Sequence, residues 1–135
     1  MKYIVSKRNK KILFYSSFKT IISIITSFYY NKRDFTFLTI ILLFTSLNYW
    51  RKPNYGVRRN IDIFWSCFVM LYHLKKSFNL RFNSIRYYYI ITFFFNIYLY
   101  FLGKITLKEI DGVNYHCKFH TIGNLSNIIL YKYLE

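Results

Sequence analysis

The sequence predicts an all-α integral membrane protein in which residues 1–135 form a single bundle of four to five transmembrane helices. Hydrophobic residues make up 54% of the chain and aromatic residues 24%, a composition far from that of average soluble domains. The apolar residues are grouped in blocks whose lengths approach those of membrane-spanning helices. The lysines and arginines lie mainly between these blocks, where they would meet lipid head groups. The blocks are too long, and alternate too little, for the strands of a membrane barrel.

The first three blocks carry clear helix signals. Residues 11–30 have spanning length but include Lys19 near the middle, so this lysine must face a partner or extend its side chain to the interface. Residues 35–50 form the cleanest apolar stretch and end in aromatic residues that suit the interface. Residues 60–74 open with polar capping residues and close at two lysines, which predicts a third span.

The last two blocks differ in polarity. Residues 84–103 are continuous and aromatic-rich, and Gly103 is a suitable stop for their helix. Residues 112–131 contain two histidines, a lysine and three asparagines, so hydropathy alone does not predict a span. Their spacing is helical, and a polar helix of this length fits a membrane if its polar side faces the bundle interior. The alternative is an amphipathic helix lying on the membrane surface.

The charge balance predicts the partners and the orientation. The chain has 20 lysines and arginines against 5 acidic residues, a net charge of +15. In a soluble protein this balance would suggest nucleic acid, but charges clustered between apolar blocks favour the lipid bilayer and its anionic head groups, and no nucleic acid. Basic residues in alternate connectors favour a cytoplasmic N-terminus. Part of the lysine excess is typical of an A+T-rich genome, such as a viral one.

The sequence shows no secretory features. Cys67 and Cys117 are the two cysteines, and two lone thiols within apolar or helical segments do not form a disulfide framework. We expect them to be free and buried. The basic residues 1–11 are not followed by a small-residue cleavage site, so we expect no removable signal peptide.

Four ionisable residues fall at predicted membrane depth, where such residues are costly and therefore functional candidates. His116 and His120 are spaced i, i+4, so both imidazoles project from one side of a helix and could hold one metal ion. Asp62 could be a third ligand or orient a metal-bound water. His73 lies about the length of the third span away from Asp62, so we expect it outside that site, as an interfacial residue.

Structural interpretations of the same residues remain open. Asp62 could cap the third helix and pair with Arg58 or Arg59. His116 and His120 could hydrogen-bond asparagine or serine side chains of a neighbouring span, a common use of polar groups between membrane helices.

The stretch from Ser46 to Trp50, the later Asp62, and the motif His-Cys-Lys-Phe-His ending at His120 together resemble the CREST superfamily of membrane proteins. This group includes alkaline ceramidases and the progestin and adipoQ receptors. Its members have a serine followed four residues on by a histidine, an aspartate in the next span, and two histidines separated by three residues in the final span. The resemblance implies zinc-dependent hydrolysis of lipid amides, with three histidine ligands and an aspartate that holds the zinc-bound water.

On this resemblance, Ser46 and Asp62 match the catalytic serine and aspartate, and His116 and His120 match two zinc ligands. The position four residues after Ser46 is Trp50 rather than histidine, so one ligand is missing. The chain also has about five predicted spans where the family has seven.

Because a catalytic zinc is held by three protein ligands, the sequence favours a multi-pass, non-enzymatic membrane protein with a structural or interaction role and no cofactor. It would assemble with itself or with a larger complex. The alternative is a zinc-dependent, CREST-like lipid amide hydrolase or a degenerate relative of one. Phosphate loops, nucleophile elbows and calcium-loop motifs are absent from the sequence. The sequence also has no ring of acidic residues and no paired broken helices, so it does not support a channel or transporter.

Overall fold

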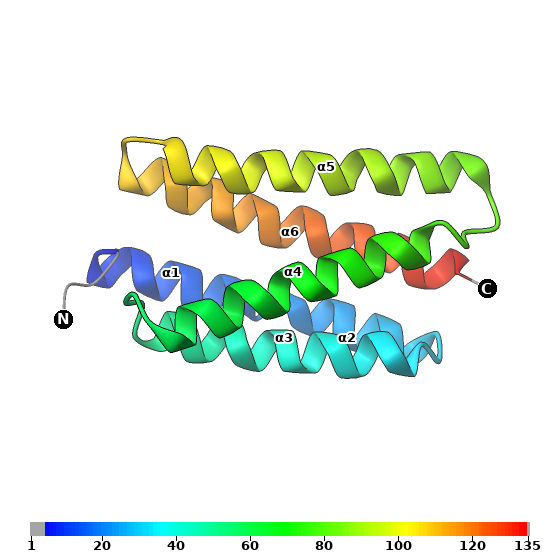
Figure 1. Ribbon diagram of the computed structural model, residues 1–135, viewed down its shortest axis with the longest axis horizontal. Helices are drawn as coiled ribbons and strands as arrows, with labels where there is room; N and C mark the ends of the chain where they lie inside the picture. Colours follow the sequence, from blue (N-terminus) through cyan, green and yellow to red (C-terminus); the bar gives the residue numbers. More distant parts are fainter. Residues whose placement is uncertain (1–4, 135) are drawn as a thin grey trace.

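The computed structural model describes residues 5–134, and within them the chain is all α-helical, as the sequence predicts. Five long helical segments run back and forth along one axis, joined by short connectors, and the first segment is divided in two (Figure 1). The helices are α1 (Lys7–Ser17), α2 (Thr20–Tyr29), α3 (Arg33–Arg51), α4 (Val57–Ser77), α5 (Asn83–Ile105) and α6 (Glu109–Tyr133).

The first predicted span is interrupted at Phe18 and Lys19. Here the backbone N–H groups of Phe18 and Lys19 donate to carbonyls three residues back, Tyr15 O and Ser16 O, each at 3.1 Å. The chain therefore tightens for one turn and continues in nearly the same direction (Figure 1). Lys19 faces α6, where its Nζ lies 2.7 Å from Thr121 Oγ1. The lysine in the middle of the first span thus has a partner inside the bundle.

The third predicted span begins earlier than expected. α4 begins at Val57 after Gly56, whose φ of 143° suits glycine and whose N-cap position makes no side-chain hydrogen bond. Asp62 therefore lies inside the helix, and the prediction that it caps the helix is wrong. The sequence misplaced this start because Arg58 and Arg59 are charged and do not extend the apolar pattern.

The polar fifth segment is a full-length helix of the bundle. α6 packs along α5 and also contacts α1 and α2. Two close backbone approaches hold the α5–α6 pair at one end: a Cβ on Gly112 would lie 2.8 Å from Gly103 O, and a Cβ on Gly103 would lie 3.1 Å from Gly112 O. The asparagine side chain at Asn96 adds a bridge, since its amide is placed to donate to Phe119 O and to accept from Gly123 N.

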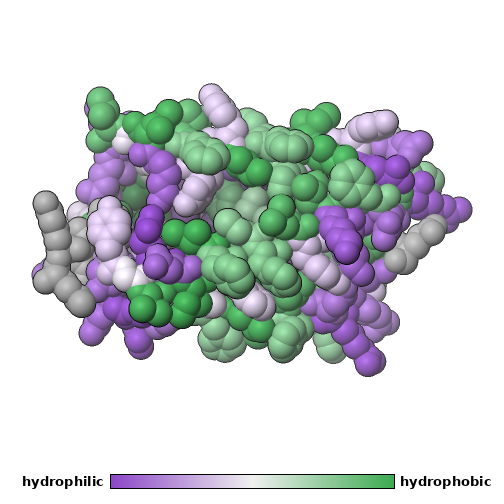
Figure 2. Space-filling view, in the orientation of Figure 1, coloured by the Kyte–Doolittle hydropathy of each residue, from purple (hydrophilic) through white to green (hydrophobic). Residues whose placement is uncertain are grey.

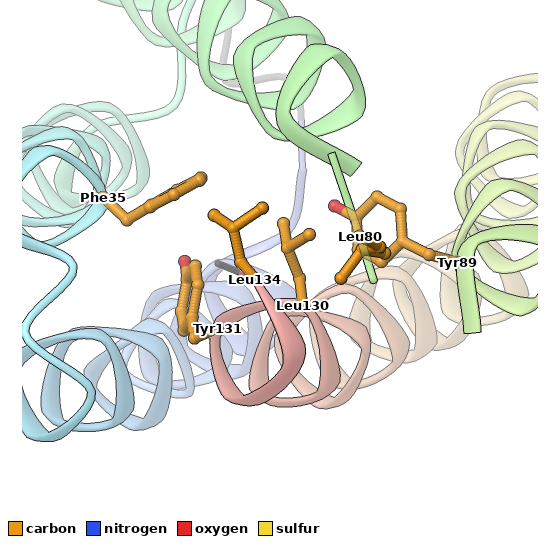
Figure 3. Packing of buried hydrophobic residues seen from close by; sticks show 6 residues of the cluster. All are labelled: Phe35, Leu80, Tyr89, Leu130, Tyr131 and Leu134. Carbon is orange, nitrogen blue, oxygen red and sulfur yellow. The ribbon is translucent and has the colours of Figure 1, made fainter. Parts of the chain in front are cut away.

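Apolar clusters close both ends of the interior. One cluster contains Leu13, Tyr49, Trp50 and Val113. The other lies where the ends of α4 and α6 meet α3 and α5 (Figure 3), and its members are Phe35, Leu80, Tyr89, Leu130, Tyr131 and Leu134.

Small polar side chains fill much of the space between the two clusters. Ser23 Oγ donates to Asn124 Oδ1 at 2.5 Å, and Asn127 Nδ2 donates to Ser23 Oγ at 3.3 Å. Ser23 is fully buried and Thr39 is 1% exposed. The middle of the interior is therefore polar and hydrogen-bonded across helices.

The outer surface shows the opposite pattern. Large apolar side chains are exposed along the helices, among them Phe28 at 74%, Ile91 at 68% and Phe44 at 67%. On the face drawn in Figure 2, apolar residues gather across the middle and hydrophilic residues gather mainly toward both ends. Within the described residues, two helical stretches, Lys7–Tyr29 and Asn83–Ile105, are long and apolar enough by themselves to cross a membrane.

Candidate functional site

A cavity of about 370 Å³ lies between α3, α4, α5 and α6. Its wall includes all four residues that the sequence analysis placed in a site, Ser46, Asp62, His116 and His120, together with Trp50. These residues come from three different helices, so the fold gathers positions that lie far apart in the chain.

Ser46 and Asp62 face each other across the α3–α4 hairpin. Ser46 Oγ donates to Asp62 Oδ1 at 2.7 Å, and both residues are buried, at 9% and 8% exposure. Within residues 5–134 the one ion pair joins Lys76 and Asp34, with 3.6 Å between Nζ and Oδ2. Asp62 is therefore paired with a serine, and the predicted ion pair with Arg58 or Arg59 is wrong.

His116 and His120 lie one turn apart on the same side of α6, as their spacing predicts. Their ring centroids are 4.7 Å apart. His120 Nδ1 lies 3.2 Å from Ser16 Oγ on α1, so one imidazole also makes the hydrogen bond to a neighbouring helix that the structural interpretation predicts. His116 is surrounded by aromatic rings, with Tyr100 at 6.3 Å and Phe119 at 5.7 Å between centroids.

Trp50 lies directly beside the histidine pair. Its ring centroid is 5.3 Å from that of His116, at an interplanar angle of 74°. Trp50 is 7% exposed and belongs to the apolar cluster at this end of the bundle. Trp50, at the position where the CREST pattern has a histidine, thus lies next to His116.

The residues around the cavity do not form a complete metal site. Among residues 5–134, no three histidine, cysteine or acidic side chains converge closely enough to hold a metal ion. Two imidazoles are available, and the nearest carboxylate of the predicted set, Asp62, accepts from Ser46. This donor set does not fit a zinc ion held by three protein ligands.

His73 lies elsewhere in the bundle. It is 2% exposed, its Nδ1 lies 2.7 Å from Val69 O, and its Nε2 lies 2.7 Å from the Tyr131 hydroxyl. It borders a second cavity of about 100 Å³ that shares Ser46 and His120 with the larger one, but His73 itself does not line the larger cavity. The expectation that it lies outside the Asp62 site is confirmed, but it is a core residue rather than an interfacial one.

Sequence reasoning missed two residues at the site. Lys104 lines the larger cavity, and Ser16 binds His120. Arg59, which the sequence suggested only as an ion-pair partner of Asp62, also lines this cavity, and its spacing of three residues from Asp62 places both on one side of a helix. Ser16 could not be found in this way, because its contact depends on how α1 packs against α6.

No family model, no curated protein and no solved structure matches this chain. The likeness to the CREST superfamily therefore rests on four positions of the sequence, Ser46, Asp62, His116 and His120. Their common cavity is a property of this chain's own geometry, and the functional argument that follows depends on that geometry.

Proposed function

We propose that the protein is a multi-pass integral membrane protein in which all five long helical segments cross the bilayer. The distribution of polarity supports this proposal. Ser23 and Thr39 are buried while Phe28 and Ile91 are largely exposed, and the exposed apolar residues form a band between hydrophilic ends. In water such an exterior would be unfavourable. In a bilayer the band contacts lipid, and buried hydroxyl and amide groups bond between helices.

The same reasoning makes α6 a span although its hydropathy is low. Its polar residues Asn124 and Ser126 are buried and bond within the bundle, so lipid does not solvate them. A helix with a polar inner side needs less average hydropathy than one surrounded by lipid. The N-terminus is cytoplasmic in this proposal, since the basic connectors α3–α4 and α5–α6 then face the same side.

Within this membrane framework the protein is non-enzymatic and has a structural or interaction role. One observation carries this conclusion, namely that Trp50 packs against His116 where a third imidazole would be needed. An indole ring is not a zinc ligand, and it is too bulky to leave the position open to water. The residues that line the cavity around Trp50 and His116 therefore suit binding or assembly better than hydrolysis.

A zinc-dependent lipid amide hydrolase is the second candidate. The observation in its favour is that Ser46, Asp62 and both histidines line one cavity. Two imidazoles and an aspartate would have to recruit a further ligand for the metal, and zinc would then supply the Lewis acid and the activated water.

Zinc content distinguishes the two candidates. The full chain would be purified in detergent as wild type, as His116→Ala/His120→Ala, and with Trp50 changed to histidine or phenylalanine. We expect equally little zinc in the wild type and the double variant. We expect Trp50→His to bind zinc, because it restores the third imidazole beside His116, and Trp50→Phe not to bind it.

Two results would contradict the proposal. Stoichiometric zinc in the wild type, lost in the double variant, would favour the hydrolase. In the second result, the Trp50→His variant remains monodisperse and helical by circular dichroism but binds no zinc. That result would show that position 50 does not supply a third ligand beside His116 and His120.

A further inference from the structure

The larger cavity opens between α4 and α5. These two helices make few contacts with each other, whereas α5 packs tightly on α6 and α3 packs on α4. Both helices contribute apolar lining residues, Ile63 and Leu71 from α4 and Ile97 and Phe101 from α5. Leu71 is 61% exposed and Phe101 is 58% exposed, so the apolar wall reaches the outer surface. In the proposed membrane setting, this α4–α5 slot faces lipid.

Two cations lie at one end of the slot. Arg59 stands near the start of α4 and Lys104 near the end of α5, and both line the cavity. Arg59 is half-buried and Lys104 is exposed. The Arg59 guanidinium carbon lies 5.2 Å from the Tyr55 ring centroid, and Lys104 Nζ lies 5.3 Å from that of Tyr100.

No carboxylate neutralises this pair within the described part of the chain, where the single ion pair is formed by Asp34 and Lys76. Asp62 lines the same cavity, but its hydrogen bond goes to Ser46. Arg59 also lies near Tyr49, which lines the same cavity and whose neutral hydroxyl does not balance the charge of Arg59. An anion between two like charges at the edge of an apolar cavity forms charge-assisted hydrogen bonds with both.

The depth of this pair suits a lipid head group. Arg59 and Lys104 lie near helix ends. On the same side, the end of α3, the α3–α4 connector and the start of α4 add Arg51, Lys52 and Arg58. This side is cytoplasmic in the proposed orientation. Anionic phospholipids attract basic residues at this level of a membrane. The cavity volume of about 370 Å³ is within the range of known ligand pockets.

We propose that the α4–α5 slot binds an anionic phospholipid, whose phosphate lies between Arg59 and Lys104 and one of whose acyl chains lies along the apolar wall. This inference rests on the proposed membrane location. It also differs from what the CREST resemblance implies, because a neutral lipid amide has no charge to satisfy two cations.

Native mass spectrometry of the full chain in detergent tests the inference. Phosphatidylglycerol and phosphatidylcholine with identical acyl chains would be added separately, and ceramide and glycerol phosphate would serve as further probes. We expect phosphatidylglycerol to be retained roughly tenfold more than phosphatidylcholine. Arg59→Gln/Lys104→Gln should abolish this preference, and the matched control Arg51→Gln/Lys52→Gln, at the same end but outside the cavity, should keep it.

A second variant separates lipid binding from loss of folding. Ile97→Trp leaves both cations in place but fills the slot, so it should lose retained phospholipid while remaining helical and monodisperse. The inference would be overturned if the two phospholipids were retained equally, or if ceramide were preferred. It would also be overturned if glycerol phosphate bound as strongly as the lipid, or if the control variant lost the preference equally. A protein that needs no detergent would instead contradict the proposed membrane location.

Discussion

Single side chains at the helix ends fix how the first and last helices meet. Glu109 at the start of α6 is exposed, yet its Oε1 accepts from Asn9 Nδ2 at 2.8 Å and from Ser6 N at 2.7 Å. These hydrogen bonds favour the ionised carboxylate and hold the pKa of Glu109 below its usual value of 4.5. Asp34, at the start of α3, is a second carboxylate at a helix end, and it contacts α4. Desolvation would raise the pKa of Asp34, but the hydrogen bond from the Tyr72 hydroxyl and the nearby Lys76 ammonium group lower this pKa on balance.

The Glu109 contact predicts a pH-dependent loss of stability. A lowered pKa in the folded state stabilises the fold above pH 4.5, and this contribution is lost as the pH falls through the folded-state pKa. Glu109→Gln should therefore lower the melting temperature slightly at pH 7, and the difference from wild type should shrink below about pH 4. Thermal unfolding in detergent followed by circular dichroism measures both.

The control for this prediction is Asp111→Asn, which removes a carboxylate from the same helical turn but neither of the Glu109 bonds. The melting temperatures of Glu109→Gln and wild type could also differ by the same amount at low pH as at pH 7. That result would show that the carboxylate charge does not stabilise the contact between α6 and α1.

At the scale of helices, the α5–α6 pair depends on two glycines that face each other. Because a Cβ on Gly112 would meet the backbone oxygen of Gly103 at 2.8 Å, the helices cannot keep this separation if Gly112 gains a side chain. Small residues at helix crossings have the same role in membrane proteins generally.

Gly112→Ala should destabilise the protein by roughly 1–3 kcal/mol, the usual cost of overpacking. Gly103→Ala should cost less, since its nearest contact is longer, at 3.1 Å. Asn114→Ala is the matched control, because Asn114 is exposed on the same helix. Denaturation in mixed micelles would measure the differences, and equal stability of Gly112→Ala and the control would refute the close approach.

The helices themselves were largely predictable from sequence. Apolar blocks and basic connectors predicted each of the five long segments to within about four residues, and α1, α4 and α6 begin three or four residues earlier than predicted. The turn at Phe18 and Lys19 was not predictable, because neither glycine nor proline marks it and the helix pattern continues through it. The sequence left open whether α6 spans the bundle or lies on a surface. Its polar side chains find hydrogen-bond partners only when α1 and α2 pack against it, and this packing cannot be read from α6 alone.

The candidate site was predictable in its members more than in its contacts. The hairpin topology brings Ser46 near Asp62, and helical periodicity pairs His116 with His120. The contacts of Ser16 with His120 and of Trp50 with His116 depend on long-range packing, which spacing along the chain does not encode. The same holds for the opposition of Arg59 and Lys104 across the α4–α5 slot.

At the scale of the whole molecule, the middle of the interior is polar although apolar clusters close its two ends, and many large apolar side chains are exposed on the surface. Hydroxyl and amide groups such as Ser23 and Asn124 bond to each other inside, and the surface between the hydrophilic ends is apolar (Figure 2). The zinc and lipid proposals both assume that this apolar band contacts hydrocarbon. A surface of this kind in contact with water would drive association of the molecules.

Extraction of isolated membranes tests this assumption most directly. Membranes from cells that express the chain would be washed with alkaline carbonate, then with detergent, and the protein followed by immunoblotting. We predict that it stays in the pellet through the carbonate wash and enters solution only with detergent, as integral proteins do. Release by carbonate alone, as a monodisperse helical protein, would contradict the membrane bundle.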